Sequence, residues 1–280
     1  MYKIVLDSCG ELTEEMAKSG RFTNVPLSIE LDGETILDDG NFNRVEFIEK
    51  VKASKNSPKS ACPSPEEYMK AYEGDYERVY VITLSSKLSG SYNSAVLAAE
   101  LYAEEHGDNK KIHVIDSKSA SVGESLIGYK LYELEEAGGK SFEEMVKEAE
   151  EYRDMIATFF VLEDIDTLRK AGRLSNIKAF VANTLNIKPI LGSTPEGEIQ
   201  QLGQARGVKK ALIKMIDDVL EATDNKEDRV LGIAQCNCPE RAQMVKEMIE
   251  KKANFRKIMI VDTMAISTMY ANDGGIIIVV

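Results

Sequence analysis

This sequence of 280 residues contains only two histidines and no glycine-rich nucleotide-binding loop. The two histidines, His106 and His113, fall at a predicted helix end and inside a predicted strand, so neither is an obvious general base. The pattern Gly-x-Ser-x-Gly is absent, which argues against a serine hydrolase of the α/β type. Neither Gly-x-Gly-x-x-Gly nor a Walker sequence occurs, which argues against a nucleotide-binding domain.

Cysteine is also rare, and the cysteines do not form a metal-binding pattern. Cys236 and Cys238 are close together but have no histidine or further cysteine nearby, which is weak evidence for zinc. The other two, Cys9 and Cys62, are far apart in the sequence. We therefore expect free thiols, no metal and no cofactor.

Long apolar segments are missing as well. The longest run, residues 276–280, is far too short to span a bilayer, and residues 1–3 lead directly into an apolar strand rather than a signal peptide. We expect a cytoplasmic protein without stable membrane insertion. Its 47 acidic residues outnumber 35 basic ones, and the net charge of −12 argues against nucleic acid or an anionic membrane as the main partner. A small anionic ligand is not excluded.

The first half of the chain does contain a regular alternation of short apolar runs and helical segments. The apolar runs at residues 2–6, 79–82 and 111–115 are typical of parallel strands covered on both faces by helices. The pattern changes near residues 154–158. We therefore predict an α/β fold of two domains, an N-terminal parallel-sheet three-layer domain (1–156) and a C-terminal α/β domain (157–280).

Turn residues predict the finer organisation. Asp32-Gly33 predicts a hairpin or a pair of short strands at residues 25–31 and 34–37. Three prolines within residues 58–65 argue against any regular element there. The expected elements of the second half are a helix that follows Ser175 and ends at about Leu185, a hairpin of residues 187–191 and 198–205, and a helix-strand-helix-strand series before a last strand.

The stretch from Thr83 to Ala95 joins a predicted strand to a predicted helix through a loop crowded with hydroxyls. Ser89 or Ser91 is placed to cap the helix, and the free N–H groups at such a helix start form an anion site at the carboxyl end of a strand. A serine-rich loop that only starts a helix fits the pattern equally well. Ser60, in the stiff segment before another helix, either adds a hydroxyl to this site or belongs to a plain connector.

Two arginines attract attention because each adjoins a glycine near the end of a predicted element. Glycine permits a tight turn, which leaves the guanidinium groups of Arg173 and Arg206 accessible to a carboxylate or phosphate. The alternative interpretation is a pair of surface arginines that form ion pairs with some of the many acidic residues.

Taken together, these stretches resemble the DegV family of bacterial fatty-acid-binding proteins. The similarity runs through most of the chain, and the matches at residues 86–95 and 186–191 are specific in combination. The matching segments are Asp7-Ser8, Ser60-Ala61-Cys62-Pro63-Ser64-Pro65, Ser85 to Ala95, Val114-Ile115-Asp116-Ser117, Leu168 to Ser175 and Leu185 to Leu191.

The resemblance implies two α/β domains with one long-chain fatty acid buried between them. In the family, hydroxyl groups hold the carboxylate. That role carries over onto Ser60 and Ser89, helped by Gly90 and the backbone of Ser91.

The resemblance also implies a partner. Family arginines associated with docking to a fatty acid kinase carry over onto Arg173 and Arg206, and the kinase phosphorylates the bound acid, so the chain itself is not expected to be an enzyme. One departure concerns the head group. Met269 stands where the family has a histidine near the carboxylate, and Tyr270 or Asn272 is a candidate substitute.

Two other functions stay open at this point. One is a degenerate regulatory paralogue that binds lipid without a kinase. The other is a serine-dependent acyl hydrolase.

Overall fold

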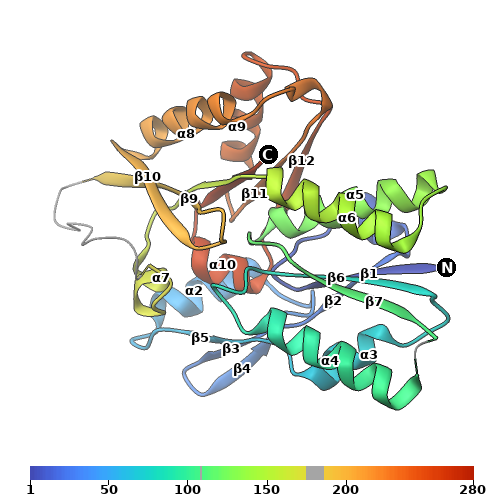
Figure 1. Ribbon diagram of the computed structural model, residues 1–280. Helices are drawn as coiled ribbons and strands as arrows, with labels where there is room; N and C mark the ends of the chain where they lie inside the picture. Colours follow the sequence, from blue (N-terminus) through green and yellow to red (C-terminus); the bar gives the residue numbers. More distant parts are fainter. Residues whose placement is uncertain (108, 175–185) are drawn as a thin grey trace.

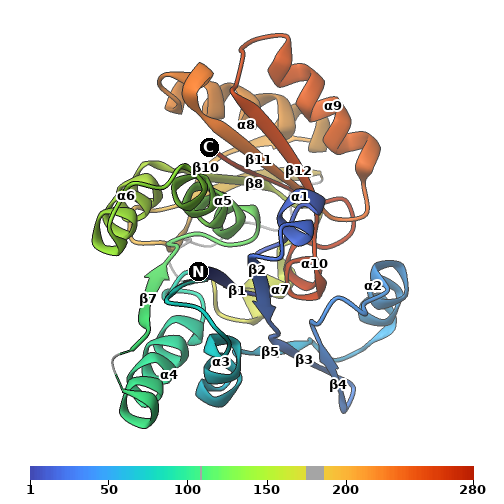
Figure 2. The same ribbon diagram turned by 90° about the vertical axis from the view of Figure 1, so that its right-hand side faces the viewer.

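The computed structural model describes residues 1–107, 109–174 and 186–280. Its elements are stacked in layers: two helices, a parallel sheet, two more helices, a second sheet and a further pair of helices (Figures 1 and 2). The helix expected between Ser175 and Leu185 lies outside the described residues.

The first half forms a parallel sheet, called sheet A, with the strand order β2-β1-β6-β7. α3 and α4 cover one face and α5 and α6 the other, so the predicted parallel three-layer arrangement is confirmed (Figure 1). The bounds are β1 (Tyr2–Asp7), β2 (Phe22–Val25), β6 (Arg78–Thr83), β7 (Lys111–Asp116), α3 (Pro65–Tyr72), α4 (Ser91–His106), α5 (Val122–Ala137) and α6 (Phe142–Met155).

Alternation along the strands explains why both faces of sheet A are buried. In β6, Val79 and Val81 pack against α3 and α4, whereas Tyr80 and Ile82 face α5 and α6. Successive side chains of a strand point to opposite faces, so a continuous apolar run places a hydrophobic side chain on each. α3 begins as expected, with Ser64 in a capping box and Pro65 at the first helical position.

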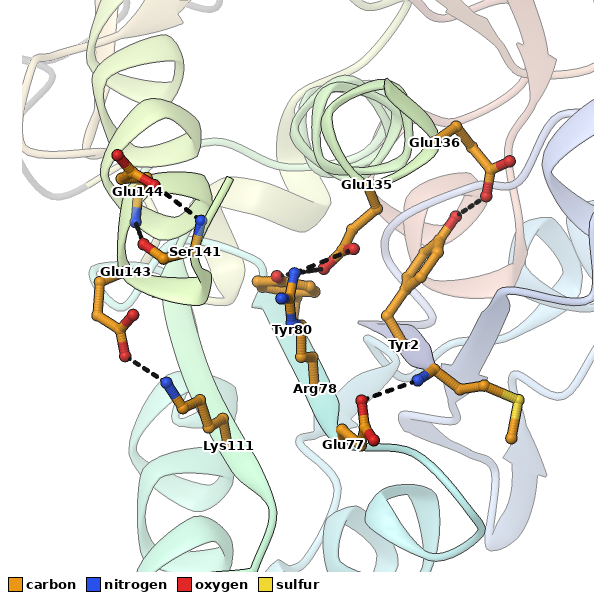
Figure 3. A network of polar contacts seen from close by, with 11 residues as sticks. Tyr2, Glu77, Arg78, Tyr80, Lys111, Glu135, Glu136, Ser141, Glu143 and Glu144 are labelled. Atoms are coloured by element: carbon orange, nitrogen blue, oxygen red, sulfur yellow. Dashed lines mark hydrogen bonds and ion pairs between the residues drawn. The ribbon is translucent and has the colours of Figure 1, made fainter. Parts of the chain in front are cut away.

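Polar contacts join the amino ends of the sheet A strands to α5 (Figure 3). Arg78 forms an ion pair with Glu135 of α5 at 3.2 Å, and the Tyr80 hydroxyl donates to the same carboxylate at 2.5 Å. The Tyr2 hydroxyl donates to Glu136 at 2.6 Å. These contacts fasten the end of α5 to the sheet.

A small antiparallel sheet, called sheet B, lies beside the carboxyl ends of sheet A, with the order β4-β3-β5. Its strands are β3 (Ser28–Leu31), β4 (Glu34–Leu37) and β5 (Lys59–Ala61). α2 (Arg44–Ala53) packs against this sheet, whereas α1 (Glu14–Lys18) packs on the core of sheet A. The hairpin at Asp32-Gly33 is confirmed.

Two predictions for sheet B are wrong. Residues 25–31 are not one strand, because β2 ends before Pro26 and β3 starts at Ser28 in a different sheet. Residues 58–65 do contain a regular element, β5. Its prolines, Pro58, Pro63 and Pro65, all flank the strand, so no ladder N–H is lost, and β5 lies at the edge of the sheet.

The second half forms a mixed sheet, called sheet C, with the order β10-β9-β8-β13-β11-β12. The predicted hairpin of β9 and β10 is confirmed, and α8 and α9 cover the outer face of the sheet. The bounds are β8 (Thr158–Val161), α7 (Asp166–Lys170), β9 (Ile187–Ser193), β10 (Ile199–Arg206), α8 (Val208–Ala222), the 3₁₀ turn η1 (Lys226–Asp228), β11 (Val230–Gln235), α9 (Pro239–Glu250), β12 (Lys257–Asp262), α10 (Ala265–Ala271) and β13 (Ile276–Val279).

α5 is shared by the two sheets. Its apolar residues join one core that contains Ile4 and Ile82 of sheet A together with Val230 and Val279 of sheet C. The change from sheet A to sheet C falls between α6 and β8. The division into domains 1–156 and 157–280 remains our proposal, because hydrophobic packing is continuous across that point.

Within the part of the chain that the structure describes, no helix is both long and apolar enough to cross a bilayer.

Candidate functional site

A cavity of about 320 Å³ lies between the carboxyl ends of sheet A and the inner face of sheet C. The loops after β1 and β6 diverge there, and such a switch point in strand order is where open α/β sheets bind ligands. The cavity is lined by Cys9, Leu27, Ser60, Ala61, Cys62, Leu84, Leu88, Ser89, Gly90, Lys118, Ser119, Ala120, Ser121, Thr158, Phe160, Leu162, Leu168, Arg173, Gly192, Ser193, Gly197, Glu198, Ile199, Ile266, Ser267, Tyr270, Ala271 and Ile277.

One end of the cavity, which we call the mouth, is formed by Ser60, Cys62, Ser89, Gly90 and Tyr270. The Ser60 and Tyr270 hydroxyls share a hydrogen bond at 2.8 Å, although β5 and α10 are far apart in the sequence. Ser89 is half-buried, and Cys62 and Gly90 are exposed. The structure thus brings together the sequence-predicted residues Ser60, Ser89, Gly90 and Tyr270 at one opening.

The start of α4 differs from the prediction. Gly90, not Ser89 or Ser91, is the N-cap residue, and no side chain caps the helix. The Ser89 hydroxyl instead accepts a hydrogen bond from the N–H of Ser91 at 3.2 Å. Among the described residues, neither the Gly90 N–H nor the Ser89 hydroxyl proton has an acceptor, so both donors are available at the mouth.

Asp7 holds this loop in place from the end of β1. Its carboxylate accepts from the N–H of Leu84 at 2.9 Å and from the Ser91 hydroxyl at 2.6 Å, so it fastens both ends of the loop. The Ser91 hydroxyl also bonds to that of Tyr68 at 2.6 Å. Ser91 is therefore fully buried and does not line the cavity, and its side chain stabilises the loop rather than contacting a ligand.

A second carboxyl group lies beside Asp7. Burial, followed by the charge of Asp7, raises the pKa of Glu124 well above its ordinary value. Burial also raises the pKa of Asp7, although three donors stabilise its charge. Because three other donors stabilise the Asp7 anion and the pKa of Glu124 is raised well above its ordinary value, we assign the proton to Glu124 and the charge to Asp7.

The same region contains the one group of possible metal ligands found among the described residues. The ligand atoms of Asp7, Cys9 and Glu124 lie within 4.8 Å of one another. Burial raises the pKa of the Cys9 thiol well above its ordinary value, and a protonated thiol is a poor ligand. A hydrogen-bonded core explains this group better than an ion site.

Of the remaining predicted residues, Met269 and Arg206 do not line the cavity, whereas Arg173 does. Met269 is buried with Ile29 and Phe47 and does not line the cavity, whereas its neighbour Tyr270 does. Arg173 lines the cavity, is half-buried, and donates from Nε to the carbonyl of Leu88 at 3.2 Å, next to Ser89. Arg206 is exposed at the end of β10.

Sequence reasoning expected the second domain to cover the ligand but named none of the residues that sheet C contributes to the cavity wall. Phe160 of β8, Leu162 just after that strand and Ile277 of β13 give the interior its apolar surface. The tip of the β9–β10 hairpin closes the cavity over the loop of sheet A, where the Ser85 hydroxyl donates to the carbonyl of Gly197 at 2.8 Å. Gly197 has a φ of +88°, and a Cβ there would lie 2.3 Å from that hydroxyl, so only glycine fits.

Fold and site together define an α/β protein with a largely apolar cavity and a hydroxyl-lined mouth at the carboxyl ends of a parallel sheet. The chain belongs to the DegV family, since the family model described as "Uncharacterised protein, DegV family" matches residues 1–280. A DegV domain-containing protein of Streptococcus gordonii is 35% identical over 278 residues, which is 99% of this chain and 97% of the relative.

Solved structures of the family are similar over the whole chain. A DegV-family protein of Ruminococcus gnavus, described with vaccenic acid, is 52% identical with a TM-score of 0.96 and covers 100% of this chain and 99% of its own. The Fatty Acid Kinase (Fak) B3 protein of Streptococcus pneumoniae, loaded with linoleic acid, is 33% identical with a TM-score of 0.88, and the coverage is 100% and 98%.

Proposed function

We propose that the protein binds a long-chain fatty acid in the cavity, with the carboxylate at the mouth, and presents that carboxylate to a fatty acid kinase. The observation that carries the proposal is one continuous cavity that joins an apolar interior to free hydrogen-bond donors at an exposed opening. The fatty acids named for the Ruminococcus gnavus and Streptococcus pneumoniae proteins support the same ligand class.

The two ends of the site suit the two ends of such a ligand. Each buried methylene contributes about 0.8 kcal/mol, so a chain of about a dozen gives roughly 10 kcal/mol before ordering costs are subtracted. The carboxylate needs donors or it takes up a proton, and Ser89, Gly90 and the Ser60–Tyr270 pair supply them. In this site Tyr270 takes the place that the resemblance assigns to a histidine.

An acyl hydrolase finds no support in the geometry. His106 stacks on Tyr102 with ring centroids 4.2 Å apart, and His113 contacts Glu150 at 3.2 Å. Neither histidine lines the cavity, so neither is placed to activate a serine at the mouth.

Mass spectrometry of the protein as isolated tests ligand binding. We expect a co-purified acyl species, and after delipidation we expect the protein to take up added fatty acid in a one-to-one complex. Absence of any acyl species together with no uptake would end the proposal.

A pull-down with a fatty acid kinase tests the partner. We expect the lipid-loaded protein to retain the kinase and Arg206→Ala to retain less, because Arg206 is exposed. Lys209→Ala, which removes a charge from an exposed position on the adjoining helix, is the matched control. Lipid binding without kinase retention would instead identify a regulatory paralogue.

A further inference from the structure

Three hydroxyl groups converge on the inner wall of the cavity, where a hydrocarbon ligand would need none. They belong to Ser119 in the loop before α5, Thr158 of β8 and Ser193 of β9, and we call them the inner hydroxyl group. The Ser119 and Thr158 hydroxyls share a hydrogen bond at 2.6 Å, and the N–H of Thr158 donates to the Ser193 hydroxyl oxygen at 3.4 Å.

Close packing of β8 against β9 brings these residues together. Gly192 immediately precedes Ser193, and a Cβ at Gly192 would lie 2.6 Å from the carbonyl oxygen of Thr158. Any larger residue would therefore push β9 away from β8 and separate Ser193 from Thr158. The absence of a side chain at residue 192 is what allows the inner hydroxyl group to form.

The hydroxyl protons of this group have fewer acceptors than those of the other serines of the interior. Ser121 donates to Glu11 at 2.8 Å and Ser267 donates to the carbonyl of Cys9 at 3.3 Å, so their protons are used. Ser119 and Thr158 have each other and, at 3.5 Å, the carbonyl of Ala120. The Ser193 proton has no acceptor among the described residues.

A plain acyl chain lying against this wall would remove water from Ser193 without replacing the lost hydrogen bond, and an unsatisfied buried donor is costly. A ligand hydroxyl would resolve this, because its oxygen accepts the Ser193 proton while its own proton goes to an oxygen of Ser119 or Thr158. The same cavity connects this group with the donors at the mouth.

We propose that the preferred ligand is a hydroxy fatty acid, held by its carboxylate at the mouth and by a hydroxyl on its chain at the inner hydroxyl group. This inference rests on the proposed function and adds the substrate class. The inner hydroxyl group selects the ligand, whereas the apolar wall and the mouth bind any long-chain acid of suitable length.

Calorimetric titration of the delipidated full chain tests the inference. The probes are stearic acid and a series of hydroxyoctadecanoic acids that differ only in the position of the hydroxyl. We expect at least one isomer to bind about tenfold more tightly than stearic acid, the size expected for one additional hydrogen bond.

Variants then assign the preference to its residues. Ser193→Ala and Thr158→Val are each expected to remove most of the tenfold preference. Ser193→Ala does so partly by tightening stearic acid binding, because the plain chain no longer buries an unsatisfied donor, whereas Thr158→Val changes stearic acid affinity less than about twofold. Ser267→Ala is the matched control, because Ser267 lines the same cavity but its proton is already used. Stearic acid binding that is retained or tightened also shows that each variant is folded.

The outcomes separate the two proposals. If stearic acid binds and every hydroxy isomer binds no better, the hydroxy-acid inference is overturned and the proposed function stands. A preference that survives in both Ser193→Ala and Thr158→Val also overturns it. If neither stearic acid nor any isomer binds, the proposed function fails and the inference falls with it.

Discussion

At the scale of single residues, Ser89 is the clearest test of the mouth. Its proton is free among the described residues, and the Ser91 N–H fixes its oxygen. We predict that Ser89→Ala weakens fatty acid binding by about 1.5–3 kcal/mol, the usual range for a hydrogen bond to a charged group, measured by calorimetry. Ser86→Ala, on the same loop but outside the cavity wall, should change affinity little. If both variants bind the fatty acid with the same affinity, the carboxylate is held at another site.

Glu11 provides a second test at this scale, through pH. Burial raises its pKa to about 7 from 4.5, and one of its oxygens has no partner among the described residues. Because the folded state holds the proton more tightly than the unfolded state, protonation of this carboxyl group at low pH increases the free energy of unfolding. Its contribution is complete below about pH 4.5 and is lost as the pH rises to about 7.

We therefore predict that wild-type stability falls relative to Glu11→Gln between these pH values, by at most about 3 kcal/mol. Urea unfolding of both proteins at several pH values measures the difference. Parallel curves for the two proteins would show that Glu11 does not titrate in this range.

At the scale of elements, α10 depends on a cap from a distant part of the chain. The Asp38 carboxylate accepts from the N–H groups of Ala265 at 2.7 Å and Ile266 at 3.1 Å, and α10 carries Tyr270 to the mouth. We predict that Asp38→Ala lowers the free energy of unfolding by about 1–2 kcal/mol, the cost of a lost helix cap, and also weakens lipid binding. Asp39→Ala, at the exposed neighbouring position, serves as the control in denaturant unfolding and calorimetry. Normal lipid affinity in a destabilised Asp38→Ala would mean that α10 does not position the ligand.

The same element shows how far local sequence could predict the structure. Strands such as β6 and β11 were predictable because a run of apolar residues reports burial on both faces. α10 was missed because it is rich in β-branched and hydroxyl residues and its cap comes from Asp38, 227 residues earlier. Ser91 was misjudged as a cap for a similar reason, since Asp7 uses its hydroxyl.

The mouth and the interior of the cavity also differ in how well the sequence predicts their residues. Ser60, Ser89 and Gly90 stand in loops whose hydroxyls and glycine mark them as candidates, so they could be named from the sequence. Thr158 and Ser193 sit on strands among apolar residues, and only the pairing of β8 with β9 brings them together. A site built from strand pairing leaves no local signal.

At the scale of the whole molecule, α5 joins the two sheets, and Gly232 marks a point of close contact between α5 and sheet C. A Cβ at Gly232 of β11 would lie 2.5 Å from a methyl group of Val122 at the start of α5, with the second methyl at 3.2 Å. Val122 is fully buried and has a short, branched side chain, so it cannot turn away from an added methyl group. Gly232→Ala must therefore move α5 away from sheet C.

We predict that Gly232→Ala lowers the free energy of unfolding by about 1–3 kcal/mol, the usual cost of overpacking, and lowers the melting temperature by several degrees. Because the core on α5 contains residues of both sheets, calorimetry should show a single transition that shifts as a whole. Gly203→Ala is the matched control in sheet C, since its Cβ would meet only the flexible end of Lys214 closely. Two transitions, of which Gly232→Ala shifts one, would mean that residues 1–156 and 157–280 unfold independently and that α5 does not couple them.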